Sequence, residues 1–224
     1  MEVNSPTFGN PVSNNSIAHH PEQYSKSWLM QRFCLSPCKD YDPQMLDRAE
    51  TATRLRGIKT PTSAAVIVPF VERQGELFIL FTRRASHLKH HPNQISFPGG
   101  KVDPEDVDTF ATALREMEEE IGVMTGRDSI FGTLPILPTV SGYHVTPVLA
   151  FVDSDYQPTI NHQEVDCLFE VPLRQILDQR SWGSHQIQFK GKTYNLDAVH
   201  YQGHLIWGVT AQILRIFIHQ MGFK

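Results

Sequence analysis

Cysteine is scarce in this sequence, with 3 among 224 residues. Cys34, Cys38 and Cys167 are too few for a disulfide framework. The first two lie close together, but no second Cys or His pair stands at zinc-finger spacing, which argues against a structural zinc site. We therefore expect free thiols, which are typical of proteins in a reducing cytosol.

Long apolar runs and basic runs are also missing. No uninterrupted apolar stretch approaches the roughly 20 residues of a membrane-spanning helix, and the N-terminus has no signal-peptide pattern. The formal net charge is −4 at pH 7, and no cluster of Lys and Arg indicates a nucleic-acid surface. The sequence predicts a cytoplasmic protein without membrane or nucleic-acid partners. It leaves the oligomeric state open, with a homodimer as one alternative.

The chain divides into a polar start and one domain. Residues 1–24 are rich in Asn, Ser, Pro and Gly and are predicted to form a mostly disordered arm. Residues 25–224 are enough for one domain with a sizeable core. Periodicity predicts helices over 27–35, 106–121 and 208–221, strands within 60–70, 76–82, 130–137, 144–152 and 164–171, and a hairpin region over 185–206. These elements lack the regular alternation of a doubly wound sheet.

The segment ALREMEEEIG, residues 113–122, carries four glutamates, three of them consecutive. A helix turns about 100° per residue, so Glu116, Glu119 and Glu120 share one side of the helix, whereas Glu118 points elsewhere. Arg115 precedes Glu119 by four residues and can orient its carboxylate. The spacing predicts a wall of three carboxylates beside one guanidinium.

A helix face of this kind has two interpretations. Phe110, Leu114, Met117 and Ile121 form an apolar stripe on another side of the helix, and Gly122 is a natural stop, so the carboxylates can face a cleft. Three converging carboxylates suit hard divalent cations such as Mg²⁺ or Mn²⁺. Acidic runs are more often solvated surfaces, and the glutamates alone leave that alternative open.

The residues around these glutamates resemble a known motif. GGKVDPEDVDTFATALREMEEEIGV, residues 99–123, is similar to the Nudix box: G, five residues, E, seven residues, then R-E-U-x-E-E-x-G-U, where U is aliphatic. The matching positions are Arg115, Glu116, Met117, Glu119, Glu120, Gly122 and Val123. Between Gly100 and Arg115 the chain has one extra residue, and Asp106 fills the acidic position. That extra residue leaves the role of Asp106 open but keeps the helix spacing intact.

A second segment resembles the coenzyme A pyrophosphatase branch of the Nudix family. LFTRRASHLKHHPNQISFPGG, residues 80–100, matches the motif of that branch at Leu80, Thr82, Arg84, Ala85, Phe97, Pro98, Gly99 and Gly100. Lys89 replaces an arginine, which keeps the charge but loses the bidentate fork. Asn93 replaces a glycine, and Asn tolerates a left-handed backbone better than most residues.

The resemblance implies both a fold and an activity. The fold is α/β, an α/β/α sandwich with a central mixed β-sheet and a loop–helix–loop catalytic motif, over residues 25–224. The activity is hydrolysis of the pyrophosphate bond of coenzyme A, and of its thioesters or oxidised form, to 3′,5′-ADP and 4′-phosphopantetheine with Mg²⁺ or Mn²⁺. The alternatives are hydrolysis of another nucleotide such as ADP-ribose or NADH, and a non-catalytic nucleotide-binding module.

The resemblance also suggests roles for the acidic helix. Glu116 and Glu120 are expected to bind the metal ions. Glu119 is either a third ligand or the base that takes a proton from water, and Arg115 is expected to hold Glu119. Glu118 is expected to take no part.

Substrate contacts are expected from residues before this helix. One of Arg83 and Arg84 is expected to bind a phosphate, although both can be ordinary strand-end charges. Lys89, His90 and His91 are candidates for the 3′-phosphate of coenzyme A, although His-rich surface loops are common. The backbone of Gly99 and Gly100 is expected to help hold metal or phosphate. Near the C-terminus, Thr210 is predicted to cap the last helix and Trp207 to belong to the core.

Overall fold

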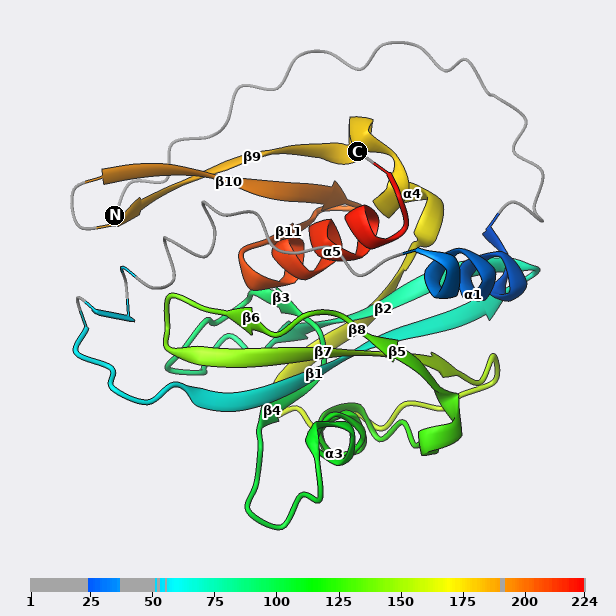
Figure 1. The fold of residues 1–224 in the computed structure, drawn as a ribbon, viewed down its shortest axis with the longest axis horizontal. Helices are drawn as coiled ribbons and strands as arrows, with labels where there is room; N and C mark the ends of the chain where they lie inside the picture. Colours follow the sequence, from blue (N-terminus) through cyan, green and yellow to red (C-terminus); the bar gives the residue numbers. More distant parts are fainter. Residues whose placement is uncertain (1–23, 37–50, 52, 55, 190–191, 224) are drawn as a thin grey trace.

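The computed structural model describes residues 24–36, 51, 53–54, 56–189 and 192–223. The predicted arm over residues 1–24 therefore lies, apart from Tyr24, outside the described residues. Figure 1 shows a central sheet with helices on both faces. The fold is the expected α/β/α sandwich around a mixed sheet, and one further small sheet accompanies it.

The centre of the large sheet is a hairpin with a parallel neighbour. Strand β1 (Thr62–Arg73) pairs antiparallel with β2 (Glu76–Arg84) and parallel with β7 (Tyr143–Val152). Gln74 and Gly75 form the hairpin turn with φ angles of 52° and 81°, as a turn with two left-handed residues requires. The other strands of this sheet are β3 (Ile95–Ser96), β4 (Gly99–Lys101), β5 (Ile130–Thr133), β6 (Leu137–Pro138) and β8 (Val165–Pro172).

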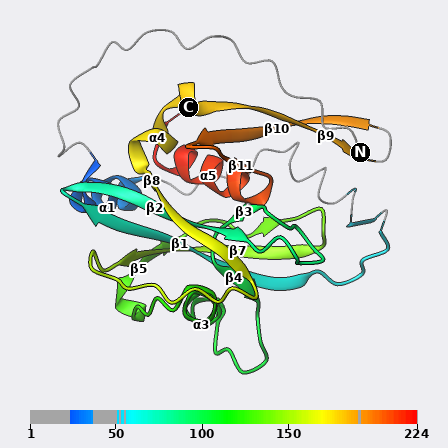
Figure 2. The ribbon, with the colours of Figure 1, turned by 180° about the vertical axis from the view of Figure 1, so that it is seen from behind.

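Helices cover the two faces unequally. Helix α3 (Thr109–Ile121) covers one face, and Figure 2 shows the same arrangement from behind. On the opposite face lie α1 (Lys26–Leu35), α4 (Leu173–Leu177) and α5 (Val209–Gln220). The structure also has two short 3₁₀ helices, η2 (Arg127–Ser129) and η3 (Gln179–Ser181).

The predicted hairpin region over 185–206 is confirmed and forms a second sheet. It consists of β9 (Trp182–Phe189), β10 (Lys192–Tyr201) and β11 (His204–Trp207) in the order β11-β10-β9. The sheet lies on the outer side of α5 (Figure 1). In the large sheet, the single strand predicted over 130–137 is instead two separate short strands, β5 and β6.

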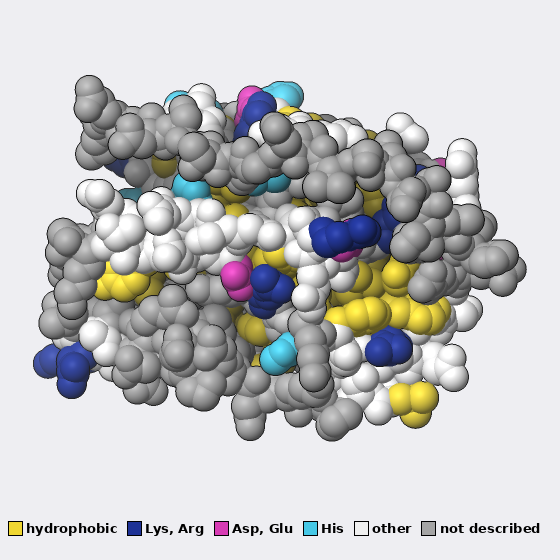
Figure 3. Space-filling model, turned by 90° about the horizontal axis from the view of Figure 1, so that it is seen from above, with side chains coloured by type: hydrophobic (Ala, Val, Ile, Leu, Met, Phe, Trp, Pro, Cys, Tyr) yellow, Lys and Arg dark blue, Asp and Glu magenta, His cyan; other side chains and the backbone are white. Residues whose placement is uncertain are grey.

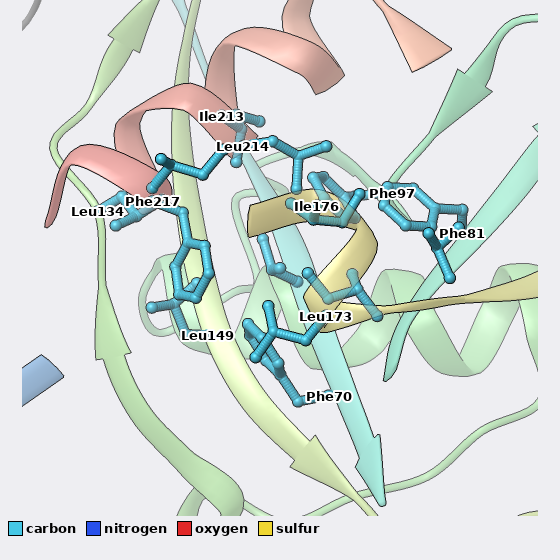
Figure 4. Packing of buried hydrophobic residues seen from close by; sticks show 14 of the residues in the cluster. Phe70, Phe81, Phe97, Leu134, Leu149, Leu173, Ile176, Ile213, Leu214 and Phe217 are labelled. Atoms are coloured by element: carbon cyan, nitrogen blue, oxygen red, sulfur yellow. The ribbon is translucent and has the colours of Figure 1, made fainter. Parts of the chain in front are cut away.

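Each face of the large sheet has its own hydrophobic core. Ile79 and Phe81 of β2 belong to the cluster shared with α4 and α5, whereas Leu80 belongs to the cluster shared with α3. Figure 4 shows Phe217 of α5 packed toward Phe70 and Leu149 in the first cluster. Because strand side chains alternate between faces, residues 79–81 fix which face each later residue of β2 occupies.

Helix α3 begins later than its sequence predicts. The prediction placed its start at Asp106, but Asp108 is the N-cap, and its Oδ1 accepts hydrogen bonds from the N–H groups of Phe110 (3.0 Å) and Ala111 (2.9 Å). Such a cap satisfies N–H groups that have no partner within the helix. The predicted stop is confirmed, because Gly122 ends the helix in the left-handed conformation at φ 67°.

Among the described residues, no helix has the length and apolarity to cross a membrane. Figure 3 shows the molecule from above, and on the described part of that face the Lys and Arg side chains form separate groups among hydrophobic and polar ones.

Candidate active site

Arg115, in the middle of α3, is the centre of a network of carboxylates. Its Nε and Nη2 donate to Oδ1 and Oδ2 of Asp106 at 3.1 and 2.9 Å. Its Nη1 donates to Glu116 Oε1 and Glu119 Oε2, each at 3.0 Å. A further bond reaches the carbonyl of Lys101 at 3.3 Å. The predicted contact between Arg115 and Glu119 is therefore present, and one guanidinium holds three acidic side chains.

Asp106 is the acidic residue whose role the sequence left open. Besides its two bonds from Arg115, it accepts the N–H of Asp103 at 2.9 Å and the hydroxyl of Thr112 at 2.8 Å. These bonds, those from Arg115 first, hold the pKa of Asp106 well below its usual range. The extra residue is absorbed in the loop before α3, so Asp106 still reaches Arg115 nine residues further on.

Glu120 is the most enclosed of the glutamates, with 3% of its surface exposed. Burial raises its pKa to about 8, and the negative charges of Glu116 and Glu164 add to that shift. The positive charge of Arg84 and the N–H of Gly99 act in the opposite direction. Among the described residues, no Lys, Arg or His pairs with Glu120 within 4 Å. A buried carboxylate with carboxylate neighbours marks a place where positive charge would be stabilising.

Glu116 lies directly against the backbone of the glycine pair. Strand β4 places Gly100 beside Ala65 and Gly99 beside Val66 of β1. A methyl group on Gly100 would lie 2.2 Å from Glu116 Oε1, and one on Gly99 would lie 2.4 Å from the carbonyl of Ala65. Burial raises the pKa of Glu116, and Arg115 opposes that shift. Gly100 therefore gives the Glu116 carboxylate the space that it occupies, whereas Gly99 permits the close approach of β4 to β1.

Glu164 was not predicted from the sequence. It is exposed, and its charge raises the pKa of both Glu116 and Glu120. The loop that carries it is bonded to the end of α3, since the N–H of Asn161 donates to the carbonyl of Glu120 at 2.9 Å and the N–H of Glu164 donates to the carbonyl of Asn161 at 3.0 Å. The only sequence signal was an acidic residue before a strand, and its place depends on the pairing of β8 with β2.

The two arginines at the end of β2 lie on different faces of the sheet. Arg84 follows the alternation of Leu80 toward α3, where its charge lowers the pKa of Glu120. Arg83 follows Phe81 to the opposite face and pairs with Asp166, its Nε lying 2.7 Å from Oδ2. Only Arg84 is therefore brought to the carboxylates.

The loop after β2 keeps its basic side chains in solvent. Lys89 and His90 are exposed, and in the described part of the chain neither has a hydrogen bond or an ion pair. Asn93 has a φ of 61°, which fits its place at a position where the family motif has glycine. The structure therefore does not bring Lys89 and His90 together with the glutamates.

Two expectations near the C-terminus, for Thr210 and Trp207, differ from what the structure shows. Thr210 is not the cap of α5, because Gly208 takes that position and the Thr210 hydroxyl donates to the carbonyl of Ile95 at 2.9 Å. That bond ties α5 to β3. Trp207 is partly buried but belongs to neither hydrophobic cluster of the described residues, and its ring lies 4.9 Å from that of His185 in the small sheet.

The donor set suits a hard divalent cation, although the side chains do not yet converge on one point. Within the described ranges, no three His, Cys, Asp or Glu residues are arranged to hold a metal ion. Glu119 is turned to Arg115, with 56% of its side chain exposed. Glu116, Glu120 and Glu164 offer carboxylate oxygens, the ligands that Mg²⁺ and Mn²⁺ prefer, and their mutual repulsion is the charge that a cation would neutralise.

Comparison with known proteins gives consistent matches. A family model described as NUDIX domain matches residues 60–189. The chain is 37% identical over 169 residues to an uncharacterized Nudix hydrolase NudL of Enterobacter sp. (strain 638), covering 75% of this chain and 88% of that protein. It is 40% identical over 162 residues to the protein of the same name from Yersinia pestis (strain Pestoides F), covering 72% and 81%.

Solved structures resemble the chain more distantly. The Ap4A hydrolase of C. elegans in a binary complex matches 52% of this chain and 83% of its own, with 21% identity and a TM-score of 0.42. A MutT/nudix family protein from Enterococcus faecalis matches 92% of this chain and 73% of its own, with 14% identity and a TM-score of 0.45.

Proposed function

This chain belongs to the Nudix family of hydrolases, and we propose that its substrate is coenzyme A, which it splits at the pyrophosphate into 3′,5′-ADP and 4′-phosphopantetheine. The observation that carries this proposal is the position of residues 80–100, the segment that resembles the coenzyme A branch. Both ends of that segment border the glutamates, since Arg84 faces Glu120 and Gly100 lies against Glu116.

Glu116 and Glu120 would hold Mg²⁺ or Mn²⁺, with Glu119 or Glu164 as further ligands. When bound, such cations neutralise pyrophosphate charge and lower the pKa of a water molecule. Gly99 supports this arrangement, because its backbone N–H lowers the pKa of Glu120 and so favours the carboxylate that a cation needs.

Arg84 is the side chain that fits the pyrophosphate. It lies at the end of β2 beside Glu120, and in the described part of the chain no carboxylate lies within ion-pair distance of its guanidinium. An unpaired guanidinium can form two parallel hydrogen bonds to phosphate oxygens. Arg84 therefore binds and orients the substrate next to the carboxylates.

The attacking water needs a proton acceptor. Glu119 and Glu164 are the two candidates, because both lie near the proposed metal ligand Glu116. Glu119 accepts a hydrogen bond from Arg115 at 3.0 Å, which fixes its position. Glu164 is exposed and has Glu116 and Glu120 as acidic neighbours. A base must lie within hydrogen-bond reach of the proton that it takes, and both residues are charged neighbours of Glu116.

A substrate panel tests the proposal. Coenzyme A, an acyl-coenzyme A, oxidised coenzyme A, ADP-ribose and NADH are each incubated with the protein and Mg²⁺ or Mn²⁺, and products are separated by chromatography. We expect 3′,5′-ADP from coenzyme A or its derivatives at the highest kcat/KM. A higher kcat/KM for ADP-ribose or NADH would assign another substrate, and binding without turnover of any compound would indicate a non-catalytic module.

A further inference from the structure

Arg83 lies on the face of the sheet that the glutamates do not use. It pairs with Cys167 in the β2–β8 register, two residues from Phe169, which pairs with Phe81. Diagonal neighbours across paired strands lie within reach of long side chains. Arg83 is therefore close to Phe169 on the face covered by α5 and the small sheet.

A stack of aromatic rings ends beside Arg83. The ring centroids of Phe97 and Phe81 lie 4.9 Å apart, those of Phe81 and Phe169 5.7 Å, and those of Phe169 and His204 3.9 Å, with interplanar angles of 26°, 21° and 7°. The stack fixes the His204 ring near Arg83. Burial, followed by the charge of Arg83, lowers the pKa of His204, so the neutral ring carries one N–H that can donate.

The ion pair between Arg83 and Asp166 is open to solvent. Their side chains are 39% and 46% exposed, and exposed ion pairs contribute little stability. A phosphate carries more charge than a carboxylate and accepts the same bidentate hydrogen bonds from a guanidinium. A phosphate group can therefore replace Asp166 on Arg83.

Arg83 and Arg84 are adjacent residues whose Cα atoms are about 3.8 Å apart, yet their side chains serve opposite faces. Strand β2 ends at Arg84, so both guanidinium groups belong to the same end of the strand. Coenzyme A has two separate phosphate groups on one ribose, the 5′-pyrophosphate and the 3′-phosphate. Arg83 and Arg84 offer one guanidinium for each of them.

We infer that Arg83, with His204 beside it, binds the 3′-phosphate of coenzyme A while Arg84 binds the pyrophosphate. This inference rests on the proposed function and names the residues that distinguish coenzyme A from nucleotides without a 3′-phosphate. Asp166 covers the guanidinium in the absence of ligand and is displaced on binding. Lys89 and His90, which the sequence suggested for this phosphate, are not required.

The test compares coenzyme A with 3′-dephospho-coenzyme A in three variants. Arg83→Gln should raise KM for coenzyme A about tenfold, because one charged hydrogen-bonding partner of the 3′-phosphate is lost. It should leave KM for the dephospho compound and both kcat values unchanged. Asp166→Asn should lower KM for coenzyme A, because it removes the competing carboxylate. His204→Phe keeps the ring stack but removes the donor, and should raise KM for coenzyme A by less than Arg83→Gln.

Arg180→Gln is the matched control, since Arg180 also forms an exposed pair with an aspartate, Asp178, in η3, and it should change neither KM. A purely structural Arg83–Asp166 pair would give changes of the same sign in Arg83→Gln and Asp166→Asn, equal for both substrates. That result would overturn the inference.

A binding measurement separates this inference from the proposed function. By calorimetry, the wild-type protein should bind 3′,5′-ADP about tenfold more tightly than AMP, and Arg83→Gln should remove that preference without any turnover. Equal affinity of the wild-type protein for the two nucleotides would overturn the inference, even if coenzyme A is hydrolysed. Failure to hydrolyse coenzyme A in the substrate panel would instead overturn the proposed function.

Discussion

Asp106 and Arg115 form a bidentate ion pair, with Nε–Oδ1 and Nη2–Oδ2 distances of 3.1 and 2.9 Å. The same guanidinium reaches Glu116 and Glu119. Asp106 therefore determines where two of the candidate catalytic carboxylates lie, although it belongs to the loop before the helix.

Replacing Asp106 should reduce activity and stability together. In Asp106→Asn, Arg115 loses a charged partner and can move toward Glu116 and Glu119, so we expect kcat/KM to fall between about tenfold and a hundredfold. The free energy of unfolding should fall by about 1–2 kcal/mol near neutral pH. Because the pKa of Asp106 is lowered in the folded protein, this stability is present above its unfolded pKa near 4 and is lost as pH falls further. Denaturant titrations at several pH values measure it.

Asp108→Asn is the control for that substitution. Asp108 also forms a bidentate pair, with Arg127 at 3.0 and 2.7 Å, but it is not bonded to Arg115. Since Asn is a good N-cap, activity should stay close to that of the wild-type protein. An equal loss of activity in both variants would contradict the specific role of Asp106.

Glu120 should reduce stability in the absence of metal. Its pKa is raised to about 8 in the folded protein, so its contribution is favourable below the unfolded pKa near 4 and is lost as pH rises through about 8. With chelator present at pH 8, the free energy of unfolding of Glu120→Gln should therefore exceed that of the wild-type protein by more than about 1 kcal/mol. At pH 5 the two proteins should be much closer in stability. The variant should be inactive. A variant less stable than the wild-type protein at pH 8 would show that Glu120 is a structural residue.

Gly100→Ala tests the close approach of backbone and carboxylate. The added methyl group would lie 2.2 Å from Glu116 Oε1, and the flexible Glu116 side chain would move rather than the strand. We expect a small change in melting temperature and a fall in kcat/KM of roughly tenfold to a hundredfold. Gly183→Ala is the matched control, because nothing lies within 4 Å of a methyl group at that position of β9. Unchanged activity in Gly100→Ala would show that activity does not depend on the position of the Glu116 carboxylate.

The helix of the motif was the part that the sequence predicted best. Its apolar stripe and Gly122 follow from local periodicity, so the faces and the stop of α3 could be derived without other parts of the chain. Its start was wrong by three residues, because Asp106 and Asp108 are both plausible caps and only the structure shows that Asp106 bonds to Arg115 instead.

Residues that depend on strand pairing could not be derived in the same way. Glu164 and Glu120 are 44 positions apart, and their proximity depends on the loop that bonds to the end of α3. Alternation separates Arg83 from Arg84, but the sequence does not show which face of β2 carries α3. The roles of Glu116, Glu119 and Glu120 stay predictions.

The central claim is that the glutamates on one side of α3 promote hydrolysis of coenzyme A with a divalent cation. The most direct measurement is the rate of 3′,5′-ADP release from coenzyme A at saturating Mg²⁺ for Glu116→Gln and Glu118→Gln. Mutation of residues that only support metal ligands already costs about tenfold to a hundredfold, so Glu116→Gln should lose more than about a hundredfold in kcat. Glu118 is an exposed neighbour on the same helix, so Glu118→Gln should keep wild-type activity. Equal losses in the two variants, or wild-type activity in both, would contradict the account.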